Sequence, residues 1–332
     1  MRRALAKPGE WYRLLLGWRT ALRRLLGALV LGTLFWQIYT QSDLAGWWTR
    51  LRAAWSVEGH YWWLIAALLL MPLNWFLEIA KWRQLLKHSW VVSWGATTRA
   101  VLAGISVSLT TPNRIGEYGG RALVAPADQA VNIVLTSLLG SICQWVAFVG
   151  CGWPALMYWV GQRSGWSGST ILLLALLIPT GLIGILLVVR LMWIRSGGIK
   201  WGKYQTWWRW LRYHLQRLRH LRYQQVLIAL GLALVRFWVY SLQFLFLLWF
   251  FNFPLGFWQG LSGIFSIYLI QAGIPLPPGM GVITRSEVAL FVWGSEGMDP
   301  LVIVSATFSV FMVNLLLPAL LGTWFIVRNN KK

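Results

Sequence analysis

The segment "TTPNRIGEYGGRALV", residues 110–124, carries three charged side chains, three glycines and a proline between two apolar stretches. Proline and glycine are unfavourable inside helices, so this composition predicts a helix break. If the segment lies within a membrane, its non-helical backbone must be buried in protein or line a water-filled cavity. Ionisable side chains at that depth are costly unless they are paired, which makes these residues candidates for a functional site.

The composition of the whole chain places this segment in a membrane protein. Hydrophobic residues make up 58% of the 332 positions and charged residues only 12%. A water-soluble domain of this composition would lack the polar surface to cover itself. We therefore expect an all-α polytopic protein that crosses the inner (plasma) membrane of the cell several times.

Six stretches contain no Asp, Glu, Lys or Arg, and each approaches or exceeds the length of about 20 residues that a spanning helix needs. They are 25–42, 59–77, 129–162, 164–189, 237–284 and 300–327. The fifth stretch is too long for one crossing and must be broken near its Asn-Phe-Pro sequence. We predict about six transmembrane helices, at 25–42, 60–78, 130–152, 170–193, 225–250 and 300–327.

The net charge of +21 follows the positive-inside rule, by which basic residues accumulate in cytoplasmic segments. This distribution predicts a cytoplasmic basic N-terminus (1–24), a cytoplasmic basic loop (195–224) and a cytoplasmic tail (329–332). The loop has an amphipathic helical pattern that either contacts anionic lipid or only sets the topology. A signal peptide is an alternative for the first apolar stretch, but its length favours an uncleaved anchor. No nucleic-acid recognition motif accompanies the charge, so we expect no nucleic-acid partner.

Two further segments fit best as re-entrant helical hairpins. Residues 97–109 are too short to cross the bilayer before the opening segment, and residues 257–294 must begin and end on the outer side. The hairpin turns contain Pro112, Gly116, Pro277, Pro278, Gly279 and Gly281. Residues 60–152 and 225–327 then form an inverted repeat within a single membrane domain, 25–328, with the N- and C-termini inside. Inverted repeats with broken helices are typical of transporters.

The charged residues of the first hairpin allow two interpretations. If the segment is helical, Arg114, Glu117 and Arg121 share one face, and Glu117 can bridge either arginine. In one interpretation these residues are a structural clamp that holds the hairpin together. In the other, the arginines engage a lipid phosphate, because the planar guanidinium fork matches phosphate geometry.

Five other polar residues are candidates to line the same site. Arg285 and Glu287 on the second hairpin are two residues apart, so they should not pair with each other. Arg236 lies about 15 Å into its predicted helix, at 1.5 Å per residue, and should face the interior, either in an ion pair with Glu78, Glu117 or Glu287 or in the cavity lining. For Asn74 and Glu78 the simplest expectation is a hydrogen bond at a helix end and a link to Lys81.

Three segments resemble motifs of one family, the transmembrane region of lysylphosphatidylglycerol synthases, also called the flippase-like domain. "PNRIGEYGGR", 112–121, is similar to its Pro-x-Arg-x-Gly-Glu-x-x-x-Arg pattern, and "PLPPGMGVITRSEVAL", 275–290, to its second signature. "NWFLEIAKWRQLLK", 74–87, resembles its early asparagine-containing helix end. Met280 stands where a second glycine is usual, and two additional residues separate Gly281 from Glu287. The resemblance implies lipid movement between leaflets by the membrane module alone, without the soluble aminoacyl-transfer domain of the synthases.

These patterns lead to one main hypothesis and two alternatives. The main hypothesis is a flippase-like lipid translocase. We expect its partners to be anionic membrane lipids, and a homo-oligomer is left open. The alternatives are a scaffold or regulator of lipid-synthesis partners and, less favoured, a component of a lipid headgroup transferase. No residue cluster has metal-ligand spacing and no nucleophile has a base beside it, so we expect no metal, no cofactor and no catalytic residue.

Overall fold

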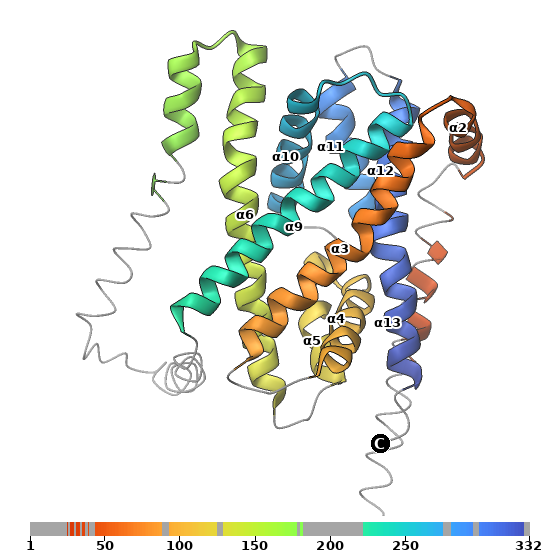
Figure 1. Ribbon diagram of the computed structural model, residues 1–332, viewed down its shortest axis with the longest axis vertical. Helices are drawn as coiled ribbons and strands as arrows, with labels where there is room; N and C mark the ends of the chain where they lie inside the picture. Colours follow the sequence, from red (N-terminus) through yellow and green to blue (C-terminus); the bar gives the residue numbers. More distant parts are fainter. Residues whose placement is uncertain are drawn as a thin grey trace, which may run out of the picture.

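The computed structural model describes scattered positions between 25 and 39, and then residues 44–87, 93–124, 129–177, 180–181, 222–274, 280–294 and 299–328. Every regular element within these residues is a helix, which confirms the predicted all-α class (Figure 1). The basic N-terminus, almost all of the loop 195–224, the tail 329–332 and the turn residues Pro277, Pro278 and Gly279 lie outside the described residues.

The described chain falls into two halves of similar helix order. The first half contains α2 (Leu44–Ser56), α3 (Tyr61–Leu86), α4 (Trp94–Ser108), the 3-10 turn η1 (Pro112–Arg114), α5 (Gly116–Leu123) and α6 (Ala130–Ser164). The second half contains α9 (Tyr223–Phe250), α10 (Phe257–Gly273), α11 (Gly281–Trp293), α12 (Pro300–Phe311), a π-helical turn (Met312–Leu316) and α13 (Leu317–Arg328).

Four helices in the described residues are long and apolar enough to cross a membrane. They are α3, α6, α9 and the continuous helix Pro300–Arg328. Only scattered positions of the predicted crossing 25–42 are described, and these are helical. Most of the predicted crossing 170–193 lies outside the described residues, although a short apolar helix, Gly168–Leu177, occupies its start. The total of six crossings therefore stays a prediction.

Two predicted helix ends are wrong. The helix predicted at 60–78 continues as α3 to Leu86, and Lys81 lies within it as the buried partner of Glu78. The helix predicted at 130–152 continues as α6 to Ser164, through Pro154. It ends at Gly165, whose φ of 66° is a left-handed conformation that favours glycine at a helix C-terminus.

The two halves pack with the same pattern of helix contacts. The first long apolar helices of the halves, α3 and α9, lie side by side along one diagonal of Figure 1. Helix α4 packs on α13, the last helix of the second half, and α10 packs on α6, the last helix of the first half. Exchanging the two halves therefore preserves the main contacts. The hairpin formed by α4 and α5 lies in the lower part of Figure 1, and α10 and α11 lie in the upper part.

The first hairpin is closed by glycines that let the backbones of α4 and α5 approach closely. A Cβ added to Gly116 would lie 2.5 Å from the carbonyl oxygen of Val107, and a Cβ on Gly120 would lie 2.7 Å from that of Ala103. These pairs run in opposite directions along the chain, so the two helices are antiparallel. The predicted turn at 110–113 is confirmed as the link between them, whereas its depth in a membrane stays a prediction.

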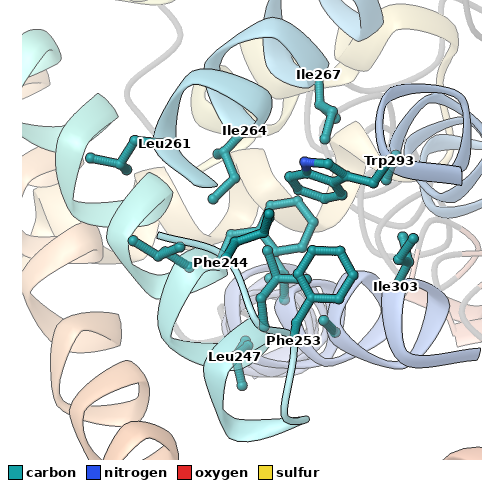
Figure 2. Packing of buried hydrophobic residues seen from close by; sticks show 14 of the residues in the cluster. Phe244, Leu247, Phe253, Leu261, Ile264, Ile267, Trp293 and Ile303 are labelled. Atoms are coloured by element: carbon teal, nitrogen blue, oxygen red, sulfur yellow. The ribbon is translucent and has the colours of Figure 1, made fainter. Parts of the chain in front are cut away.

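The second hairpin is built on an aromatic and aliphatic core. Trp293, only 1% exposed, lies among side chains from α9, α10 and α12 (Figure 2). Its indole ring packs against the rings of Phe244 and Phe253 with centroids 6.0 and 5.4 Å away. Gly263 on α10 makes room for it, because a Cβ there would lie 2.6 Å from the indole nitrogen. Trp293 therefore fixes the position of α11 relative to α9 and α10.

Helix α2 lies in the segment between the first two predicted spans, for which the sequence predicted no helix. It packs on α12 through Trp47, whose ring nitrogen donates a 3.0 Å hydrogen bond to Ser309 and whose ring lies 5.5 Å from that of Phe308. Arg50 pairs with Asp299 at 2.6 Å. These contacts attach α2 to the start of the last span.

Candidate functional site

A buried glutamate with three cationic partners lies at the centre of the molecule. The carboxylate of Glu78 forms ion pairs with Lys81 Nζ at 2.6 Å, Arg121 Nη2 at 2.7 Å and Arg236 Nη1 at 3.0 Å, and it accepts a hydrogen bond from Arg121. The side chains of Glu78, Lys81 and Arg121 are 7%, 3% and 2% exposed, whereas that of Arg236 is 20% exposed. We call these four residues the Glu78 cluster.

The cluster joins three separate parts of the fold. Helix α3 places Glu78 and Lys81 one turn apart, α5 of the first hairpin supplies Arg121, and α9 supplies Arg236. The guanidinium of Arg121 also lies 5.0 Å from the ring centroid of Trp82, a distance suited to a cation–π contact. Buried charges are tolerated when they are paired in good geometry. The cluster therefore confirms that Arg236 faces the interior and that Glu78 is linked to Lys81.

Amide side chains extend the cluster toward the last span. Arg236 Nε donates to Asn74 Oδ1 at 3.0 Å, and its Nη1 donates to Gln144 Oε1 at 3.1 Å. Asn74 Nδ2 in turn donates to Asn314 Oδ1 at 2.8 Å. The predicted helix-end hydrogen bond of Asn74 is wrong, because α3 continues and its amide bridges two other helices. Asn314 lies in the π-helical turn, a local distortion that is common at functional sites.

Arg114 and Arg121 have different surroundings, although the sequence motif treats them alike. Arg121 is paired with Glu117 as well as Glu78. Arg114 lies in η1 with φ of 61°, and α5 begins only at Gly116. The shared helical face expected for Arg114, Glu117 and Arg121 is therefore wrong. Arg114 is exposed, and its guanidinium has no hydrogen bond or ion pair within the described part of the chain.

The second hairpin contributes an arginine held by neutral groups. Arg285 Nε donates to Gln271 Oε1 at 2.9 Å, and its guanidinium lies 5.3 Å from the ring centroid of Tyr268. The ring of Tyr268 is perpendicular to that of Tyr240 at 4.9 Å, and Arg236 lies 5.9 Å from the Tyr240 ring. A continuous chain of contacts thus connects Arg285 on α11 to Arg236 on α9.

Arg114, on the first hairpin, interacts electrostatically with charged residues of the second hairpin and of α9. Its guanidinium lies within interaction range of Arg236 and Arg285, and also of Glu117 and Glu78. Residues from η1, α9 and α11 therefore bring three arginines into one region. We call Arg114, Arg236 and Arg285 the arginine cluster.

Glu287 has a different position from the other predicted site residues. It is exposed on α11, one turn before Phe291, which is 66% exposed. The prediction that it does not pair with Arg285 agrees with the contacts of Arg285, which are Gln271 and Tyr268. Whether Glu287 contacts lipid stays a prediction. Gly281, the one described turn residue of this hairpin, begins α11, and its carbonyl oxygen accepts from Gln271 Nε2 at 2.9 Å.

The neutral side chains of the site were not predicted from the sequence. They are Gln144, Tyr240, Tyr268, Gln271 and Asn314. A signal existed for the three amides, because each is a polar side chain within an otherwise apolar stretch, where such groups commonly bond to a neighbouring helix. Tyrosines at these positions carry no such signal, because apolar packing and membrane-interface positions favour them equally.

The arrangement is suited to holding an anion. Five cationic side chains, of Lys81, Arg121 and the arginine cluster, surround only two carboxylates in the described residues, those of Glu78 and Glu117. Within the same residues no group of three His, Cys, Asp or Glu side chains could hold a metal ion. The cationic side chains of this region offer an anion electrostatic attraction and hydrogen-bond donors.

The sequence of the chain matches one family of known proteins. No curated protein matches it. A family model, described as the lysylphosphatidylglycerol synthase TM region, matches residues 16–322, which is nearly the whole chain. Together with the four apolar helices, this match identifies a multi-pass membrane protein with a function related to membrane lipids. The chain belongs to the lysylphosphatidylglycerol synthase transmembrane region family.

Proposed function

We propose that the protein is a lipid translocase, which moves an anionic or modified phospholipid, or an isoprenoid-phosphate-linked lipid, between the leaflets of the plasma membrane. The headgroup passes through a polar cavity between the two hairpins while the acyl chains stay in the bilayer. The observation that supports this most is the arginine cluster, in which Arg114 of the first hairpin lies within interaction range of Arg285 on the second hairpin and of Arg236 on α9.

The division between buried and accessible charges supports separate roles. Glu78, Lys81 and Arg121 are nearly inaccessible and are joined by ion pairs through Glu78, so they act as the structural clamp. Arg114 is exposed and Arg236 and Arg285 are partly exposed, so they can reach a ligand. Like charges repel in a medium of low dielectric constant, and an anionic headgroup would relieve that repulsion. The clamp and the phosphate site are thus adjacent groups of residues.

The positions of the hairpins support a path through the membrane. They lie toward opposite ends of the bundle in Figure 1, and the spans α3 and α9 run between them. We propose that each hairpin is re-entrant, one from each face, and that residues 60–152 and 225–327 are inverted repeats. With cytoplasmic termini, the α4–α5 hairpin enters from the inside. Broken helices that meet near the midplane form the substrate sites of many transporters.

The proposal is tested by reconstitution into liposomes that contain a fluorescent anionic phospholipid. Bleaching of the outer leaflet by dithionite then reports how fast protected lipid crosses. We expect faster crossing than in empty vesicles and a loss of at least about tenfold for Arg114→Ala, the size of one charge-assisted contact. Arg99→Ala is the matched control, because Arg99 is an exposed arginine of the same hairpin that, within the described residues, bonds only to the Gly95 carbonyl oxygen. Crossing no faster than in empty vesicles would refute the proposal.

A further inference from the structure

The charges around the arginine cluster restrict what kind of headgroup it can accept. Both neighbouring carboxylates are already used, because Glu78 binds three cations and Glu117 binds Arg121. Neither of the two carboxylates within interaction range of Arg114 is free to receive an ammonium group. A cationic headgroup would therefore meet uncompensated arginines, and like-charge contacts of this kind are a strong source of discrimination.

The excess of guanidinium groups over carboxylates around the arginine cluster points to an anion with more than one charge. Arg114 has no anionic partner within hydrogen-bonding distance in the described residues. Among the residues that the structure describes, Arg285 contacts only the neutral groups Gln271 and Tyr268. Arg236 shares the carboxylate of Glu78 with two other cations. A single negative charge leaves most of this excess unbalanced.

A buried hydroxyl adds an independent sign of a ligand. The phenolic oxygen of Tyr240 is buried and has no hydrogen-bond partner in the described structure. The Tyr240 ring contacts the ring of Tyr268 and lies near the guanidinium of Arg236, and Arg285 is within electrostatic range. A buried O–H without a partner is costly. An acceptor oxygen from a ligand would satisfy it.

We infer that the arginine cluster and the Tyr240 hydroxyl form a site for a terminal phosphate monoester at the end of a lipid, in preference to a phosphodiester or an aminoacylated headgroup. A phosphomonoester carries about −1.5 to −2 charges at neutral pH and three acceptor oxygens, which matches three guanidinium groups. A phosphodiester offers one charge and two such oxygens. The inference deepens the proposed function, since it names the class of lipid that the translocase moves.

Vesicles with three probes of matched acyl chains test the inference. The probes are labelled phosphatidic acid, phosphatidylglycerol and lysyl-phosphatidylglycerol, each present as a trace in phosphatidylcholine. We expect phosphatidic acid to cross at least about fivefold faster than phosphatidylglycerol, and lysyl-phosphatidylglycerol to be slowest, as one additional charge-assisted contact would give. Phosphatidylglycerol crossing as fast as phosphatidic acid, or the lysyl lipid crossing fastest, would overturn the inference while the translocase proposal stands. If no probe crosses faster than in empty vesicles, the proposed function fails instead.

Variants separate the site from a general effect of positive charge. Arg285→Gln should remove the preference for phosphatidic acid over phosphatidylglycerol, and Arg285→Lys should retain part of it, because lysine keeps the charge without the fork. Arg99→Gln should leave the preference unchanged. If Arg285→Gln keeps the full preference, the arginine cluster does not read the headgroup.

A binding measurement keeps the inference testable even if a variant folds poorly or transport is absent. The purified wild-type protein in detergent is heated with phosphatidic acid, phosphatidylglycerol, an isoprenoid monophosphate or inorganic phosphate. Both lipid monoesters should raise the unfolding temperature more than phosphatidylglycerol does, since a ligand that binds only the folded state stabilises it. Equal protection by phosphatidylglycerol, or by inorganic phosphate at the same concentration, would contradict a lipid phosphomonoester site.

Discussion

Replacing Glu78 by glutamine is expected to destabilise the protein strongly, because this one carboxylate balances three cations. The substitution conserves shape and one acceptor oxygen, but it removes the negative charge that contacts Lys81, Arg121 and Arg236 at 2.6–3.0 Å. Two of these cations are no more than 3% exposed, so water cannot replace the lost partner.

The magnitude follows from the burial. Removing one partner of a buried ion pair costs about 3–5 kcal/mol. For a chain of this size that corresponds to a fall of about 5–10 °C in the unfolding temperature. The 26 tryptophans allow unfolding in detergent to be followed by intrinsic fluorescence.

Glu117→Gln is the matched control for this experiment. Its carboxylate is 19% exposed and binds only Arg121, which keeps Glu78 as a partner. A partly exposed pair contributes about 1 kcal/mol or less, so we expect a shift of no more than about 2 °C. If the two variants unfold at the same temperature, or if Glu78→Gln unfolds with the wild type, Glu78 does not hold the hairpin, α3 and α9 together as we have argued.

Three further predictions test the packing around the site by the same unfolding measurement. Gly116→Ala should lower the unfolding temperature by several degrees, because the added methyl would lie 2.5 Å from a backbone oxygen of α4, whereas Gly119→Ala meets no atom within 4 Å and should change it little; equal effects would contradict the close approach of α4 and α5. Asn74→Leu should cost about 1–3 kcal/mol, because it leaves Arg236 without its 3.0 Å acceptor, and an unchanged stability would refute the amide bridge. Trp293→Ala should cost about 3–5 kcal/mol through the cavity it creates, whereas the 72% exposed Trp258 should tolerate alanine, and the reverse order would contradict the core in Figure 2.

Local sequence signals predicted the elements that depend on hydropathy and on turn residues. Apolar length identified α3, α6, α9 and the final helix, and the proline and glycines of 110–124 identified the first turn. Helix ends were less predictable. Lys81 suggested that a helix had left the membrane, but its partner Glu78 keeps its ammonium group in the protein interior, and that pairing depends on residues distant in sequence.

The site was predictable in its charged residues and not in its geometry. A charge in an apolar helix is costly, so Arg236 and Glu78 could be recognised as interior residues from sequence alone. Which arginine is buried and which is free could not be recognised. The spacing of Arg114 and Arg121 in the motif predicts that they share one helical face. The left-handed backbone at Asn113 and Arg114 instead places Arg114 outside the helix that carries Arg121.

The central claim is that a phosphate-bearing headgroup binds among arginines contributed by both hairpins. A structure determined by electron cryomicroscopy in lipid nanodiscs that contain phosphatidic acid tests this claim most directly. We predict density for a lipid phosphate in contact with Arg114 and Arg285, with the acyl chains directed into the bilayer. A map with ordered arginine side chains and no lipid density among them, or with Arg114 and Arg285 facing separate surfaces, would contradict the account.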